Sequence, residues 1–463
     1  MQITDRRPEV GKRCFSSPVI EAVIRDTGAK LGDPELAALF ANCFPNTLDT
    51  TVTLGLDDAG RPDTFVVTGD IDAMWLRDST NQVWPYLQFI GADPQIGRLI
   101  QGVINRQVRC VLSDPYANAF NRDPHPSDWV SDLTDMTDQI HERKYELDSL
   151  CAVLRLSCGY HAAGGDGSCF DRRWDEAMRL IVATVRNEQA DSVEAVGQEA
   201  MGAAALADGA KPYRFQRVSP SPTETLAGGG YGQPARRCGL SKSPFRPSDD
   251  AALLPFLVPA NAMAVVGLRG LALLWRAAGG HDADAAGADA LADEIEGGIQ
   301  TQGVITHPLH GEIFAYEVDG FGSHYCMDDA NIPSLLSLPY LGYCAPDDPL
   351  YARTRGFLLS AANPYHCAGR AGRGMGSPHT GKGTIWPMAL MMQALTSQSE
   401  AEILECVGTL RSTHDGTGFM HESIWKDDAA RYTRSWFAWA NTLFGEMILY
   451  VEATRPGLLA RGR

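Results

Sequence analysis

Two adjacent carboxylates, Asp249 and Asp250, lie in the motif FRPSDDA, where a stretch rich in Pro, Gly and Ser gives way to the apolar run 251–268. The pattern predicts a helix that begins at these acids, with Ser248 as its cap and the carboxylates at the positive end of the helix dipole. Capping alone explains such a motif. The pair indicates catalysis only if other residues supply a partner.

Glu422 is a third candidate acid, because it stands among apolar and aromatic neighbours in GFMHESIWKDD. A carboxylate in such surroundings is either ion-paired or tuned for proton transfer, since an unpaired buried charge is unfavourable. Lys426, Arg431 and Arg434 are within side-chain reach, so a structural ion pair is the alternative. His421 does not make a zinc-protease motif with Glu422, because no second His follows at the required spacing.

A sugar-binding composition occurs at residues 69–80, GDIDAMWLRDST. Carboxylates and guanidinium groups bind sugar hydroxyls, and an aromatic ring packs against the apolar face of the sugar. The candidates are Asp72, Trp75, Arg77 and Asp78. The structural alternative has Asp78 capping the next helix and Arg77 paired with Asp72.

Residues 318–333, VDGFGSHYCMDDANIP, repeat the form of the first motif: a glycine-rich approach ends in the paired acids Asp328 and Asp329 before an apolar segment. Either acid could cap a helix there. His324 and Asn331 add donors and acceptors that a cap does not need. A further glycine-rich segment, RGMGSPHT, contains His379.

Charge and motif content exclude several functions. The net charge of -17 comes from 57 acidic and 40 basic residues without a Lys/Arg block, which argues against a nucleic-acid or anionic-membrane partner. The glycine motifs lack the spacing of a nucleotide-binding loop, and the segment Gly381 to Thr384 misses the P-loop pattern by one glycine.

Metal and disulfide chemistry are not expected either. Eleven scattered cysteines indicate reduced thiols, and His307 and His310, separated by Pro308, are expected in a loop rather than at a metal. We therefore expect no metal and no cofactor. Without a secretory leader or a long uninterrupted apolar segment, a cytoplasmic protein is expected.

Helical periodicity dominates the chain, whereas strand patterns are short, at 51–56, 66–68 and 312–318. About a dozen helices joined by short connections predict one all-α domain over residues 1–463, built from helical hairpins as an α/α toroid. Residues 279–288 are expected to form a surface excursion. The predicted helices cover residues 35–43, 79–90, 94–112, 144–156, 171–187, 249–278, 289–299, 331–338, 348–359, 384–395, 399–412 and 433–453.

Taken together, the segments GDIDAMWLRDS, YELDS, FRPSDDA, VDGFGSHYCMDDANIPSLLSLPYLGY, GMGSPHT and GFMHESIWKDDAARYTRSWFAWANTLFGE resemble glycoside hydrolase family 125. The resemblance spans nearly the whole chain, with the motifs in the same order. It implies an (α/α)6 toroid and an exo-acting α-1,6-mannosidase that inverts the anomeric configuration without a required metal. Its partner would be a mannose-containing oligosaccharide.

The resemblance also implies residue roles. An acid of FRPSDD would be the general acid, with Asp249 favoured and Asp250 left open, and Glu422 would be the general base. A pocket that disfavours its charge would raise the pKa of the acid. The two acids are 173 positions apart, so the chain must close on itself to bring them together. The residues expected to contact mannose are Asp72, Trp75, Arg77, Asp78, Arg246, His324, Asp328, Asp329, His379 and Trp436.

One position departs from the family pattern. The family usually has an aromatic residue, typically Trp, a few positions ahead of FRPSDD, and this chain has Lys242 there. The sugar accepted beyond mannose is therefore left open. Two other functions also stay open: a toroid glycosidase that cleaves another linkage, and a non-catalytic mannoside-binding protein. The sequence does not specify an oligomeric state.

Overall fold

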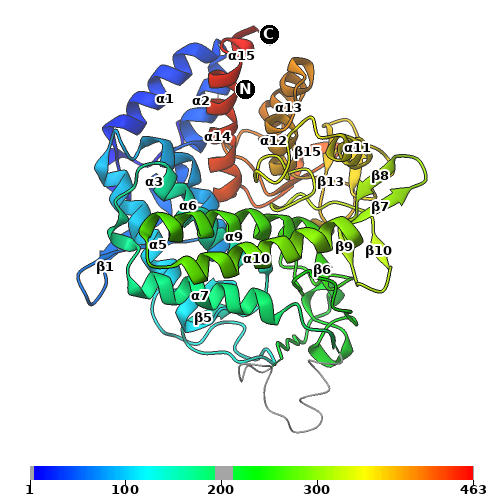
Figure 1. The fold of residues 1–463 in the computed structure, drawn as a ribbon. Helices are drawn as coiled ribbons and strands as arrows, with labels where there is room; N and C mark the ends of the chain where they lie inside the picture. Colours follow the sequence, from blue (N-terminus) through cyan, green and yellow to red (C-terminus); the bar gives the residue numbers. More distant parts are fainter. Residues whose placement is uncertain (1–4, 193–211, 462–463) are drawn as a thin grey trace.

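The computed structural model describes residues 5–192 and 212–461, in which long helices predominate and are joined by short strands and loops (Figure 1). The predicted all-α toroid is confirmed. The helices are α1 (Pro18–Leu31), α2 (Pro34–Cys43), α3 (Asn46–Thr50), α4 (Leu76–Val83), α5 (Pro94–Ser113), α6 (Leu147–Ala162), α7 (Arg172–Asn187), α9 (Val258–Ala278), α10 (Asp282–Gly298), α11 (Pro349–Leu358), α12 (Pro387–Leu395), α13 (Glu400–Ser412), α14 (Ala438–Thr454) and α15 (Leu458–Arg461).

An inner set of helices packs in sequence around the axis: α9 against α6, α6 against α4, α4 against α14, and α14 against α12. Outer helices cover them, with α10 on α9, α5 on α6 and α13 on α12. Inner helices are apolar on most sides because neighbours surround them. By composition α9 could cross a membrane, but 78% of its most apolar window is buried in the protein.

Short antiparallel strands lie between the helices. The two-stranded pairs are β1 (Val52–Leu56) with β2 (Pro62–Val66), β7 (Val304–His307) with β8 (Gly311–Phe314), and β11 (His366–Ala368) with β12 (Arg373–Met375). The three-stranded sheets are β3 (Met74–Trp75), β4 (Ala119–Phe120) and β5 (Ile140–Glu142); β10 (His324–Tyr325), β9 (Glu317–Val318) and β6 (Phe256–Leu257); and β13 (Thr384–Ile385), β14 (Ser423–Trp425) and β15 (Asp428–Thr433).

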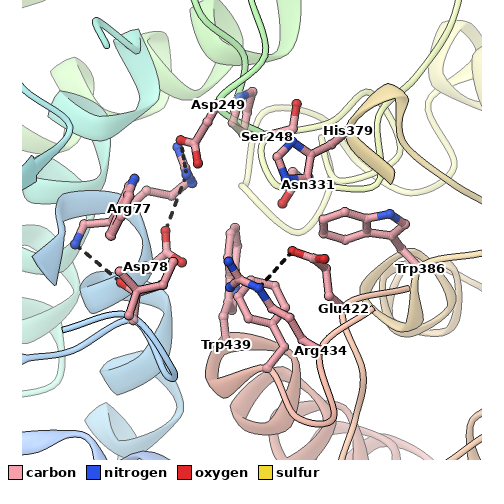
Figure 2. A pocket seen from close by; sticks show the side chains of 15 residues that line it. Arg77, Asp78, Ser248, Asp249, Asn331, His379, Trp386, Glu422, Arg434 and Trp439 are labelled. Carbon is pink, nitrogen blue, oxygen red and sulfur yellow. Dashed lines mark hydrogen bonds and ion pairs between the residues drawn. The ribbon is translucent and has the colours of Figure 1, made fainter. Parts of the chain in front are cut away.

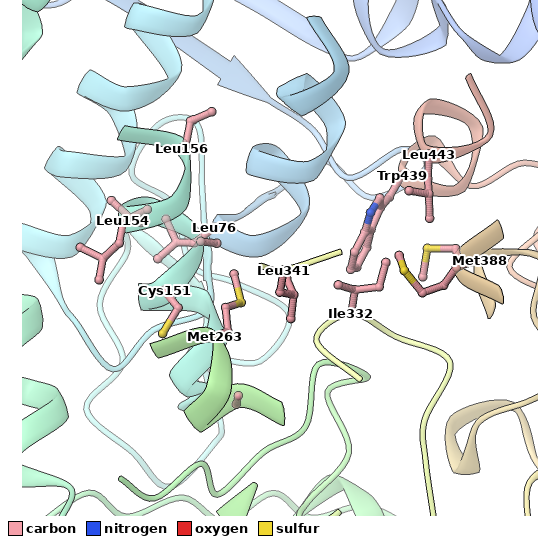
Figure 3. Packing of buried hydrophobic residues seen from close by; sticks show 14 of the residues in the cluster. Leu76, Cys151, Leu154, Leu156, Met263, Ile332, Leu341, Met388, Trp439 and Leu443 are labelled. Atoms are coloured by element: carbon pink, nitrogen blue, oxygen red, sulfur yellow. The ribbon is translucent and has the colours of Figure 1, made fainter. Parts of the chain in front are cut away.

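The interior of the ring is filled by side chains from distant parts of the chain. Figure 3 shows Met263 of α9, Ile332 and Leu341 of the turns between β10 and α11, and Met388 of α12 side by side. They belong to one hydrophobic cluster that also includes Trp439 of α14. Such interdigitation fixes the angular position of each inner helix and so the direction of the residues at its end.

The predicted helix at 249–278 begins later than expected. Helix α9 starts at Val258, because Phe256 and Leu257 pair with β9 as strand β6 and Pro259 suits the first helical turn. Ser248 therefore caps no helix; its hydroxyl donates to the carboxylate of Asp329 at 2.9 Å. The two acids of FRPSDD lie in an irregular segment ahead of β6.

The predicted helix at 331–338 is wrong. Pro333 interrupts it, and the segment is a series of buried turns in which Ser334 and Ser337 bond to each other. Other bounds differ as well: the helix expected at 79–90 is α4 at Leu76–Val83 followed by a 3-10 helix, the one at 144–156 is α6 at Leu147–Ala162, and the one at 384–395 begins at Pro387 after strand β13. The surface excursion at 279–288 is mostly helical, because α10 begins at Asp282, and α14 begins at Ala438 because the residues before it pair as β15.

Candidate active site

A pocket opens at the N-terminal ends of α4, α12 and α14, where the loop ahead of β6 and the turns at 327–343 also meet. Positive helix ends favour anionic and hydroxyl ligands. Its lining residues come from six parts of the chain: Thr68, Ile71, Trp75, Arg77, Asp78, Pro247, Ser248, Asp249, Asn331, His379, Trp386, Glu422, Arg434, Phe437 and Trp439.

The pocket brings together Asp249 and Glu422, the two acids expected to be catalytic, although 173 positions separate them in the sequence. Figure 2 shows Asp249 and Glu422 on opposite sides, with their carboxylates toward the space between them. Glu422 is buried, and Arg434 Nε lies 3.5 Å from its Oε1. Of the three ion-pair partners considered for Glu422, Arg434 is the one that the structure places in contact. Glu422 is therefore both paired with Arg434 and part of the pocket lining.

Asp249 sits in a segment that other groups hold in place. Its backbone is left-handed, with φ of 64°, and its N–H donates to the carbonyl of Arg246. The buried carboxylate of Glu317 accepts from Arg246 Nε at 2.6 Å and from the N–H groups of Leu253 and Leu254 at 2.9 Å each. Glu317 of β9 therefore bonds to residues before and after Asp249 in the chain.

The charge environment of Asp249 contradicts the expectation of a raised pKa. Burial favours the neutral form, but Arg77, Lys144, a hydrogen bond from Glu146 and His379 outweigh it and lower the pKa of Asp249 to about 2. Arg77 Nη2 lies 3.6 Å from Asp249 Oδ1, and the side chain is 28% exposed. Taken alone, Asp249 would be ionised at neutral pH.

Asp250 has a different position from its neighbour. It is buried and does not line the pocket, and its Oδ1 lies 3.6 Å from Nδ1 of His379. Burial lowers the pKa of His379, but the hydrogen bond and charge of Asp250 dominate and raise it to about 9. The histidine in the pocket is therefore a cation at neutral pH, oriented by an acid behind it.

Four predicted sugar contacts line the pocket: Trp75, Arg77, Asp78 and His379. Within the described residues, Trp75 Nε1 and Asp78 Oδ2 are buried without a hydrogen-bond partner, although Asp78 Oδ2 lies 3.4 Å from Nη2 of Arg77 as an ion pair. Burial raises the pKa of Asp78 to about 6 against the lowering effect of Arg77. Buried polar atoms are normally hydrogen-bonded, so these two are suited to ligand hydroxyls. Neither alternative for this motif holds, since Asp78 makes no cap hydrogen bond and Asp72 pairs with Arg122.

Three other predicted contacts lie outside the pocket lining on more open parts of the structure. The Asp72 side chain is 81% exposed and pairs with Arg122 at 3.1 Å. His324 is exposed on β10, and Trp436 is half-buried beside Phe419. Their contact with substrate stays a prediction.

The remaining three predicted contacts are buried and bonded to protein groups. Arg246 pairs with Glu317 at 2.6 Å. Asp328 accepts hydrogen bonds from two backbone N–H groups of the following turn, so it caps a turn rather than a helix. Asp329 accepts a hydrogen bond from the hydroxyl of Ser248. These residues support the walls of the pocket without lining it.

Most lining residues outside the prediction are neutral and carry little sequence signal. The aromatic side chains Trp386, Phe437 and Trp439 pack edge to face, with ring centroids 6.4 Å apart in each successive pair. Trp386 and Phe437 directly precede helices α12 and α14, and that position could have indicated them. The other lining residues that were not predicted are Thr68, Ile71, Pro247, Ser248, Asn331 and Arg434.

Lys242, at the position that departs from the family pattern, pairs with Glu188. Its Nζ lies 3.4 Å from Glu188, and it does not line the pocket. Among residues 5–192 and 212–461, no group of three or more His, Cys, Asp and Glu side chains could hold a metal ion. All eleven cysteines lie in those ranges as free thiols.

The sequence profile of the metal-independent α-mannosidases of glycoside hydrolase family 125 matches residues 33–449. The chain belongs to this family. It is 38% identical to a Streptococcus pneumoniae metal-independent α-mannosidase solved as a non-productive complex with α-1,6-mannobiose, and the match covers 95% of this chain and 99% of that one with a TM-score of 0.87. As a family 125 protein, it is a glycoside hydrolase.

Two other proteins similar to this family 125 chain are a relative in sequence and a protein that is similar in fold. It is 41% identical to the meiotically up-regulated gene 157 protein of Schizosaccharomyces pombe, over the whole of this chain and 91% of the relative. A bacterial glucoamylase complexed with acarbose is 12% identical, with a TM-score of 0.51 over 94% of this chain and 57% of that chain. That likeness concerns the toroid fold alone.

Proposed function

We propose that the protein is an exo-acting α-1,6-mannosidase that removes terminal mannose from mannan or N-glycan fragments with inversion of configuration. The observation that carries the proposal is the placement of Asp249 and Glu422 on opposite sides of one pocket (Figure 2). The α-1,6-mannobiose in the Streptococcus pneumoniae relative supports this linkage for the substrate.

In this mechanism Asp249 is the general acid and Glu422 the general base. Asp249 gives a proton to the glycosidic oxygen while Glu422 takes one from the attacking water on the other face of the sugar. Inversion requires the two carboxyl groups to be about 6.5–9.5 Å apart, so that a water molecule fits between the base and the sugar. Because Asp250 is buried behind His379, it is a weaker candidate for the acid than Asp249.

Around these two acids, the pocket has the groups that a mannose ring needs. Trp75 Nε1 can donate to a hydroxyl, Asp78 Oδ2 can accept from one, and cationic His379 can donate to another. Trp386 and Trp439 offer aromatic surfaces for the apolar face of the ring. The substrate contacts are thus divided between both halves of the toroid.

A proton NMR time course on α-1,6-mannobiose tests this proposal. Initial release of β-mannose is the expected result, and initial release of α-mannose would exclude inversion. The α-1,2 and α-1,3 isomers and a glucose disaccharide serve as comparisons. Hydrolysis of the glucose disaccharide alone would favour a toroid glycosidase of another linkage, whereas tight mannoside binding without hydrolysis would favour a binding protein.

A further inference from the structure

A buried cluster of carboxylates surrounds the guanidinium group of Arg77 beneath Asp249. The Nη atoms of Arg77 lie 2.5 Å from Glu146, 3.2 Å from Asp148, 3.4 Å from Asp78 and 3.6 Å from Asp249. The side chains of Glu146 and Asp148 are fully buried and that of Asp78 is nearly so. Within the described residues, one cation therefore faces four acids at contact distance.

The neighbouring cations have carboxylates of their own. Lys144 Nζ is 3.0 Å from Glu224 and 3.4 Å from Glu142, and His379 is 3.6 Å from Asp250. Three buried carboxylates and the partly exposed Asp249 around one guanidinium cannot all be ionised, because uncompensated buried charge is strongly unfavourable. The cluster must retain at least one proton.

Geometry indicates where that proton resides. Asn118 Nδ2 donates to Glu146 Oε1 at 3.4 Å and to Asp249 Oδ1 at 3.3 Å, so one amide nitrogen holds an oxygen of each acid. The two carboxyl groups are also hydrogen-bonded to each other. Two carboxyl oxygens in such contact share a proton. The Glu146 side chain is fully buried whereas that of Asp249 is 28% exposed, and burial raises the pKa of Glu146 well above its usual range, so the proton is mainly on Glu146.

We propose that Glu146 is the proton reservoir of the general acid: it holds the proton that passes to Asp249 as Asp249 protonates the glycosidic oxygen. This inference rests on the proposed function. During the step, the O–H bond of Glu146 breaks as an O–H bond forms on Asp249, and the same proton then passes from Asp249 to the leaving oxygen. The glycosidic bond breaks, and water adds to the anomeric carbon as it gives a proton to Glu422. Glu422 later loses that proton to solvent, and solvent returns one to Glu146.

Glu146 acts through Asp249 and is a positioning residue. The arrangement explains how Asp249 can donate a proton although the nearby cations favour its ionised form. The pair faces charged groups from the surrounding elements that act on its titration: Arg77, Asp78, Lys144, Asp148 and His379.

The full-length E146Q variant tests the proposal, because glutamine keeps the shape and a hydrogen bond to Asp249 but cannot release a proton. Two substrates are compared: α-1,6-mannobiose, whose leaving group needs a proton, and α-mannosyl fluoride, whose fluoride leaves without one. For E146Q we expect kcat on mannobiose to fall on the order of 10²-fold, with KM little changed and fluoride release nearly retained. D249N should show the same selectivity between the two substrates.

The matched control is E142Q. Glu142 is also buried and accepts from Asn118 at 3.1 Å, but its ion pairs are with Lys144 and Arg217. Any loss caused by E142Q should be equal on both substrates. For E146Q, the alkaline limb of kcat on mannobiose should also move by more than one unit toward lower pH, since Asp249 is left with its own lowered pKa.

Equal losses on both substrates, with an unmoved alkaline limb, would show that Glu146 is only structural. If E146Q does not fold, E146D keeps a displaced carboxyl group and should give a smaller loss with the same selectivity for mannobiose. Wild-type enzyme distinguishes the two levels of the proposal. Failure of wild type to hydrolyse α-1,6-mannobiose overturns the proposed function and this inference with it, whereas an active wild type with an unselective E146Q overturns this inference alone.

Discussion

Oδ1 of Asp250 lies 3.6 Å from Nδ1 of His379, and this contact keeps a histidine charged at the wall of the pocket. The two residues are far apart in the chain, in the segment ahead of β6 and just before β13. Asp250 is buried, whereas His379 is accessible to a ligand. Asp250 keeps the imidazole of His379 protonated, and His379 carries that positive charge at the pocket.

Replacing Asp250 with Asn should lower the pKa of His379 from about 9 toward its ordinary value near 6.5. In wild type His379 stays cationic up to about pH 9, so a contribution to sugar binding is present below that value and lost above it. In D250N the same loss should occur about two pH units lower. NMR titration of the His379 ring and KM measured against pH check this. An unchanged titration would mean that Asp250 does not control the histidine.

Removing either proposed proton-transfer residue should lower kcat on α-1,6-mannobiose by at least 10²–10⁴-fold, roughly the contribution of one acid or base. The variants E422Q and D249N keep the side-chain shape, so thermal unfolding should stay near that of wild type. For E422Q, α-mannosyl fluoride should be as poor a substrate as mannobiose, because water still needs a base. Wild-type rates in E422Q would exclude Glu422 as the base.

The Trp75→Phe variant should weaken binding without weakening the fold. Trp75 Nε1 has no hydrogen-bond partner among the described residues, so the protein loses no internal bond when the indole is replaced. A lost hydrogen bond to a ligand hydroxyl corresponds to about 0.5–1.5 kcal/mol, or roughly a 2- to 13-fold rise in mannose Kd. Calorimetric titration with mannose measures it. A fall in Tm without a change in Kd would indicate that the indole serves packing alone.

Gly445→Ala should destabilise the toroid. A Cβ at Gly445 in α14 would lie 2.6 Å from the ring of Phe44 and 2.9 Å from its backbone, so neither residue can yield easily. Overpacking of this kind typically lowers the free energy of unfolding by about 1–3 kcal/mol.

Gly408→Ala is the matched control, because a Cβ there in α13 meets nothing within 4 Å. It should be neutral or stabilising by about 0.5–1 kcal/mol, through the better helix propensity of alanine. Chemical denaturation of both variants compares the two positions. Equal stability changes would show that the contact between α14 and Phe44 is not tight.

The sequence was sufficient for much of the helix pattern, because helical periodicity is a local property. Helices α5 and α13 begin and end within one residue of the predicted bounds. Helix α1 was not predicted, although Ser17 caps it and Pro18 begins it. The errors at 249–257 and 331–338 have another origin: strand β6 pairs with β9, and buried side chains stabilise the turns, so tertiary contacts override the local pattern.

The site was predicted in part for the same reason. Arg77 and Asp78 belong to a dense motif of acids, an arginine and a tryptophan whose composition predicts sugar contacts, and both line the pocket. Arg246 and Asp328 belong to equally dense motifs, yet they are bonded to protein groups behind the wall. Which member of a motif faces the ligand depends on the direction of its side chain, and a list of residues does not contain that direction.

The left-handed backbone at Asp249 restricts which acid the site can use. At φ of 64° most side chains are strained, and the short polar side chains of Asp and Asn are among the few that adopt this region with ease. A glutamate, although equally acidic, would meet both this strain and the longer reach of its side chain. The turn geometry of this loop therefore favours aspartate over glutamate at position 249, the proposed general acid, independently of the reaction.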